Sequence, residues 1–83
     1  MNKQNNLIFI SSIISAILNI VFSFLLSPLA TKDQIKPPNG AAKLSFVSQI
    51  MHMLVHHKQV IFTSSLIVSS LVAISVFLAL KLM

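Results

Sequence analysis

The sequence predicts an all-α membrane protein: a two-span transmembrane helical hairpin with an amphipathic helix before the second span. Two stretches, Leu7 to Leu29 and Val60 to Leu80, hold no charged side chain. Each has the roughly 20 apolar residues needed to cross the hydrocarbon core of a bilayer. Of the 83 residues, 55% are hydrophobic and only 8% are charged, so the chain is too small and too apolar for a soluble enzyme domain with its own core.

Five segments follow from these boundaries and from the breaker residues. Pro28 disfavours helical geometry in the residue before it, so the first helix should end near Ser27. The loop TKDQIKPPNG is stiffened by two prolines and ends in the turn-forming pair Asn39-Gly40, so we expect no buried element there. The expected segments are a polar cap at residues 1–6, a first span at 7–29, a loop at 30–40, an amphipathic interfacial helix at 41–58 and a second span at 59–83.

The first span also has to be weighed against a secretory signal, because Lys3 precedes its apolar run. We expect the span to be retained. The run is longer than a typical signal core, and Pro28 stands at a poor position for a cleavage site of small residues.

Residues 41–58 alternate with helical spacing between a polar and an apolar side. Serine, glutamine and histidine form the polar side, while Phe46, Val47, Ile50, Met53 and Leu54 form the other. This pattern predicts an interfacial helix whose basic side chains contact lipid headgroups or a partner protein: Lys43, His52, His56, His57 and Lys58. Without glycine or proline after Ala41, the helix either continues into the second span as one rod or bends near residues 56–58.

The lysines predict the orientation. Lys32, Lys36, Lys43 and Lys58 lie between the spans, whereas only Lys3 and Lys81 lie beyond them. The loop should therefore be cytoplasmic, with both termini on the opposite side of a multi-pass protein.

The most specific pattern is a stripe of small polar residues at every fourth position of the first span, which places them on one side of a helix. The stripe and its counterpart in the second span predict either a helix-packing face or, in a ring of identical chains, a pore lining. An amide near the middle of a span needs a partner, so Asn19 should bond to second-span serines, to a symmetry-related Asn19 or to another protein. The candidate packing or pore residues are Ser11, Ser15, Asn19, Ser23, Ser65, Ser69 and Ala73.

The residue types give no support to catalysis, cofactor binding or metal binding. Asp33 is the only acidic side chain, which leaves no acid–base pair and no catalytic triad. His52 and His56 lie one turn apart, but a structural zinc normally takes four ligands. Arginine, tryptophan and tyrosine are absent, and nucleic-acid recognition usually draws on them. We therefore expect no enzyme, no cofactor, no metal, no small-molecule substrate and no nucleic-acid partner.

The apolar hairpin, its basic loop and its termini on one side resemble, in layout alone, small viral channel proteins of the two-span class. Phage holins and small subunits of respiratory or virion membrane assemblies share that layout, and no motif transfers a functional residue from any of them. The leading expectation is a structural or assembly subunit of a larger membrane complex, with a viral inner membrane beneath a capsid as one setting. Its partners would be anionic lipid, other membrane or capsid-type proteins, or copies of itself. The alternatives are a homo-oligomeric, viroporin-like pore and a holin-like protein that perturbs membranes.

Overall fold

The computed structural model describes residues 2–83 and is helical almost throughout, with no strand in that range. The all-α prediction is confirmed. In chain order the elements are α1 (Lys3–Leu26), the 3₁₀ turn η1 (Ser27–Leu29), α2 (Lys32–Ile35), the 3₁₀ turn η2 (Ala41–Lys43), α3 (Phe46–Gln59) and α4 (Ile61–Leu82).

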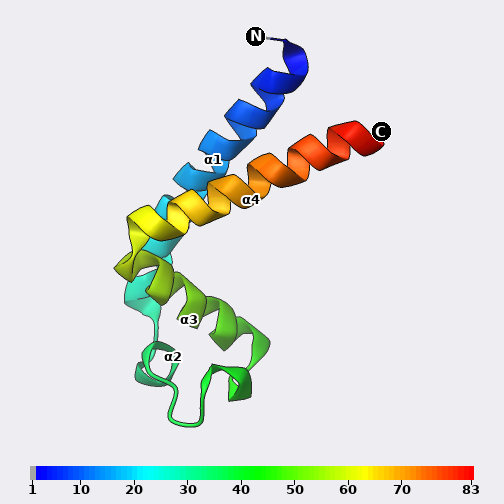
Figure 1. Ribbon diagram of the computed structural model, residues 1–83. Helices are drawn as coiled ribbons and strands as arrows, with labels where there is room; N and C mark the ends of the chain where they lie inside the picture. The colour runs from blue at the N-terminus through cyan, green and yellow to red at the C-terminus, as the bar shows by residue number, and fades with distance from the viewer. Residues whose placement is uncertain (1) are drawn as a thin grey trace.

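Two of these helices, α1 and α4, are long and apolar enough to cross a membrane. At 1.5 Å per residue, their 24 and 22 residues correspond to about 36 and 33 Å, against a hydrocarbon core of about 30 Å. The helices pack against each other near the α3–α4 joint and diverge towards the two termini, which lie at the same end of the molecule (Figure 1). The short elements α2 and α3 occupy the other end, and the molecule measures 48 × 23 × 17 Å.

Helix α1 begins four residues earlier than the expected first span. Asn2 caps it, because the Asn2 side chain accepts a hydrogen bond from the Asn5 backbone N–H at 2.7 Å. The expected polar cap is thus mostly the first turn of the helix. At the other end, α1 stops at Leu26 and Pro28 lies in η1, which matches the effect expected of that proline.

The expected loop holds one element that sequence reasoning did not anticipate, the helical turn α2. Its N-terminus is closed by a capping box, in which the Thr31 hydroxyl accepts from the Gln34 backbone and the Gln34 side chain accepts from the Thr31 backbone. Gly40 then turns the chain with φ of +89°, a conformation that favours glycine because it has no Cβ.

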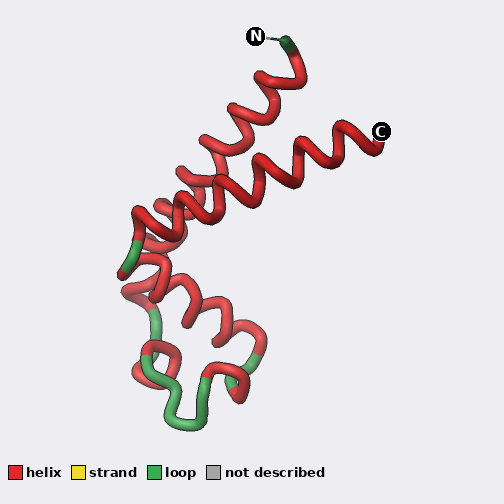
Figure 2. The backbone as a smooth tube through the Cα atoms, viewed as in Figure 1, coloured by secondary structure: helices red, strands yellow, loops and turns green. Residues whose placement is uncertain are grey.

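Helix α3 is capped by Ser45 and ends at Gln59, and α4 begins at Ile61. The residue between them, Val60, has φ −126° and ψ 53°, which interrupts the helix at the non-helical joint in Figure 2. The two helices are therefore not one rod. The bend lies just beyond the region where the sequence placed it.

The buried side chains are polar, in contrast to those of a soluble protein. Among residues 2–83 the one large apolar side chain in the buried class is Val55. Only 11% of the most apolar stretch of either long helix is buried against protein, and most of the phenylalanine, isoleucine and leucine side chains of these two helices are exposed. The buried polar side chains are Asn19, Ser23, Ser27, Ser64 and Ser65.

Candidate functional site

The centre of the molecule is a hydrogen-bond network around Asn19, which lies in α1 and is 9% exposed. Its amide nitrogen Nδ2 lies 3.0 Å from the hydroxyl oxygens of Ser64 and Ser65 in the first turn of α4. Its carbonyl oxygen Oδ1 lies 2.7 Å from Nδ1 of His57 in α3. This one amide therefore connects α1, α3 and α4, and its hydrogen-bonding groups all find partners within a single chain.

The direction of each hydrogen bond follows from Ser64. Its hydroxyl lies 3.0 Å from the His57 backbone carbonyl and 3.3 Å from that of Ile61, and carbonyls only accept. The single Ser64 proton is thus used there, so Ser64 accepts from Asn19. This places the Asn19 NH₂ group towards the serines and its oxygen towards His57, and Nδ1 of His57 must be the donor.

The network also stabilises the joint at Val60. In a continuous helix the His57 carbonyl would accept from the N–H four residues later, at Ile61. Here the Ser64 hydroxyl donates to that carbonyl, while the Val60 N–H donates to the His56 carbonyl at 3.2 Å. The same serine therefore joins α4 to α1 and supplies a hydrogen bond at the bend.

The other stripe residues have different surroundings. The hydroxyls of Ser11, Ser15 and Ser69 donate to carbonyls of their own helices, as serine commonly does in membrane helices. Ser23 is fully buried, and its hydroxyl has no hydrogen-bond partner among residues 2–83. Ala73 is half-buried. Of the predicted packing residues, the structure thus brings Asn19 and Ser65 into direct hydrogen bonding.

The predicted lipid-contact residues do not form one surface. His57 points inward to Asn19, and Nδ1 of His52 lies 2.6 Å from the Gln34 backbone carbonyl. His56 is exposed and packs edge-on against His52 with ring centres 4.3 Å apart. Lys43 and Lys58 are exposed. The Lys58 ammonium lies 5.5 Å from the centre of the Phe24 ring, which is within the range of a cation–π contact.

A second polar link joins α2 to α3, and sequence reasoning missed it. The Gln34 side chain closes the α2 capping box with its oxygen and donates to the Ser48 hydroxyl with its nitrogen at 3.0 Å. Its backbone carbonyl meets His52. The spacing of Thr31 and Gln34 was the available signal, because Ser or Thr followed three residues later by Glu or Gln marks a helix start.

The described residues include no group of three or more histidine, cysteine, aspartate or glutamate side chains placed to hold a metal ion. Comparison with known proteins gives no match to a protein family, to a curated protein or to a solved structure. The interpretation of the site therefore depends on its geometry.

We predict that Asn19→Ala lowers the free energy of unfolding in bicelles by about 1–2 kcal/mol, because it leaves His57 and two serines without their shared partner. Steric-trap unfolding measures this value. Ser69→Ala is the matched control, since the Ser69 hydroxyl bonds only within its own helix, and it should change stability by less than about 0.5 kcal/mol. Equal effects of the two substitutions would contradict the role given to Asn19.

Proposed function

We propose that the chain is a non-enzymatic, two-span integral membrane protein that acts as a structural subunit of a larger membrane assembly. The observation that carries this proposal is the inverted distribution of side chains, with polar groups buried and large apolar groups exposed. Lipid offers no hydrophobic driving force between helices, so membrane helices pack through small and polar residues and leave large apolar side chains to the bilayer. A water-soluble monomer rarely exposes so large an apolar surface.

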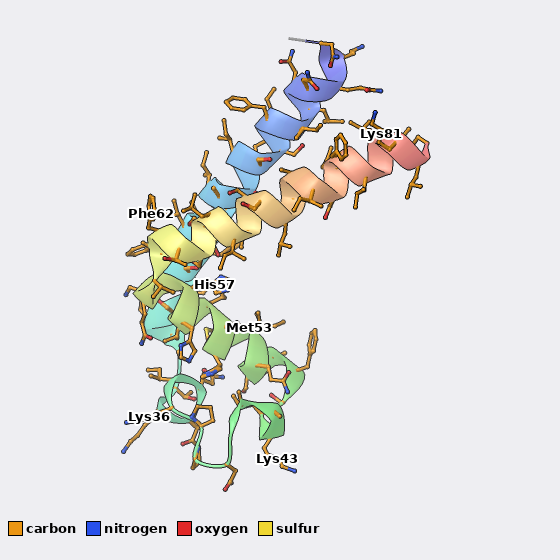
Figure 3. All side chains as sticks on the ribbon, viewed as in Figure 1. Lys36, Lys43, Met53, His57, Phe62 and Lys81 are labelled. Carbon is orange, nitrogen blue, oxygen red and sulfur yellow. The ribbon has the colours of Figure 1, made fainter. Side chains whose placement is uncertain are left out.

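The distribution of side chains on α3 also favours a membrane environment. Its Ser48 and His52 side chains turn inward to α2, whereas Phe46 is 78% exposed and Met53 56% exposed. Met53 is labelled on α3 in Figure 3. The polar side chains of Ser48 and His52 thus bond within the protein, and the large apolar side chains of Phe46 and Met53 are exposed. Such a helix is suited to the membrane interface, with its apolar side among the acyl chains.

The lysines support an orientation for the hairpin. Lys36 and Lys43 lie at the end formed by α2 and α3, and Lys81 lies near the opposite end with the termini (Figure 3). With Lys32 and Lys58, the α2–α3 end carries four of the six lysines. We propose that this end faces the cytoplasm and anionic headgroups, and that both termini lie across the membrane.

Burial of the stripe favours a structural role over a pore. A pore would need the Asn19 amide and neighbouring hydroxyls to face water in a ring of chains. Asn19, Ser23 and Ser65 are instead buried within one chain, and the Asn19 hydrogen bonds are made internally. The surface left for neighbours is the apolar outside of α1 and α4, which fits contacts with other membrane proteins as well as with lipid.

We predict that a tryptophan introduced by Phe46→Trp lies among acyl chains. The chain has no tryptophan or tyrosine, so the new side chain is the only fluorophore of its kind. In vesicles its emission should be blue-shifted and strongly quenched by brominated lipid. His56→Trp, at an exposed site on the polar side of α3, is the control and should be quenched mainly by aqueous iodide. Identical quenching of the two variants would contradict an interfacial α3.

Native mass spectrometry of the protein, extracted gently from its source membrane, tests the proposed function itself. We expect complexes in which this chain is bound to larger proteins in a fixed ratio. A closed ring of this chain alone would overturn the proposal and favour the pore. A stable, monodisperse single chain with no partner would also count against it, and growth arrest on expression would point to a holin-like activity.

A further inference from the structure

An open groove of about 480 Å³ lies between α1, α3 and α4, beside the Asn19 network. This volume is within the range of small-molecule and cofactor sites, which are mostly apolar with a few polar groups. Five of the nine lining side chains come from α1, three from α3 and one from α4, and none of them is a lysine or an acid. The apolar walls are Leu18, Phe22, Leu26, Ile50, Leu54 and Val68.

Three polar side chains also line the groove, and their remaining capacity is to accept hydrogen bonds. The amide nitrogen and the amide oxygen of Asn19 are both hydrogen-bonded to side chains of other helices. The Ser15 hydroxyl uses its proton on the Ser12 carbonyl at 2.7 Å. His57 donates from Nδ1, so in the neutral imidazole Nε2 is an acceptor, and it has no hydrogen-bond partner among residues 2–83. An occupant that bonds here must bring a donor.

The position of these residues gives the groove a direction. His57 lies at the end of α3, near the joint with α4, where Figure 3 labels it. Val68 lies two turns into α4 and Ser15 near the middle of α1. If α1 and α4 span the bilayer as proposed above, the groove runs from Leu26 at the loop end of α1, past Asn19 and His57, to Ser15 and Val68 deeper in the hydrocarbon core.

We propose that this groove binds an uncharged lipid with a hydroxyl head group, of the diacylglycerol type. The hydroxyl donates to Nε2 of His57, and an acyl chain extends from there along Leu18 and Val68, away from the loop end. The lining holds no lysine and no acidic side chain, so the groove offers no permanent counter-charge to an ionised head group. This proposal rests on the membrane location proposed above.

Photo-crosslinking in phosphatidylcholine nanodiscs tests the proposal. Two probes are compared at the same mole fraction, a diacylglycerol and a phosphatidylcholine that carry the same diazirine-labelled chain. We expect the diacylglycerol probe to label groove peptides of the full chain about fivefold more than the phosphatidylcholine probe, which corresponds to one net hydrogen bond.

His57→Asn is the diagnostic variant. Its amide nitrogen can take the place of Nδ1 and still donate to Asn19, but it has no group at the position of Nε2. We expect this variant to lose the preference for diacylglycerol, whereas His56→Asn, at the exposed neighbouring histidine, keeps it. Leu18→Trp, which fills the groove, should remove labelling by both probes, and Ile17→Trp on the outer surface should not.

The other outcomes overturn the proposal in distinguishable ways. Equal labelling by both probes in the wild type would mean that the groove accepts any acyl chain. Labelling confined to the outer faces, together with crosslinked dimers, would mean that a second copy of the chain fills it. Labelling of no residue by either probe would contradict the membrane location itself.

Discussion

The fold depends on the hydrogen bonds of one amide, that of Asn19, in the middle of an apolar helix. In the membrane location proposed above, the bilayer core offers no partner for such a group, so the protein has to provide one. Here Ser64 and Ser65 accept from its nitrogen and His57 donates to its oxygen. These bonds set which turn of α4 faces α1, and they draw the end of α3 against the same point. The bend at Val60 belongs to this arrangement, because Ser64 also bonds the His57 carbonyl beside it.

The consequence is a molecule whose small and polar side chains face inward and whose large apolar side chains face outward. Burial of Ser23 lets α1 pack closely, and the apolar outside of α1 and α4 remains free. At the loop end, Gln34 serves as partner for both Ser48 and His52, which leaves Phe46 and its apolar neighbours exposed on α3. In water such an arrangement would expose a large hydrophobic surface. In lipid the large apolar side chains are solvated, and the buried Asn19, Ser64 and Ser65 are hydrogen-bonded to one another.

The sequence was sufficient for features that depend on composition and period, and less so for those that depend on contacts between elements. It predicted the helical class, two membrane-length helices and second-span serines among the partners of Asn19, because runs of apolar residues and fourfold spacing are local. It did not predict that His57 turns inward, since its neighbours His56 and Lys58 are typical of a solvated face. The break at Val60 had no glycine or proline to mark it and arises from packing and hydrogen bonding around Ser64. The turn α2 did have a local signal, in Thr31 and Gln34. The two prolines that follow are typical of a loop, and they led to the prediction of a loop for the whole segment.

The central claim is that α1 presents Asn19 and its stripe to the protein and its apolar residues to lipid. Spin-label accessibility along α1 in bilayers tests it most directly, and the cysteine-free sequence allows a single label at each position from Ile13 to Phe24. We expect oxygen accessibility that oscillates with the 3.6-residue helical period, with minima at the buried positions Asn19 and Ser23 and low accessibility to a water-soluble nickel complex throughout. High accessibility to the nickel complex at those two positions would show that the stripe faces water, and would contradict this arrangement.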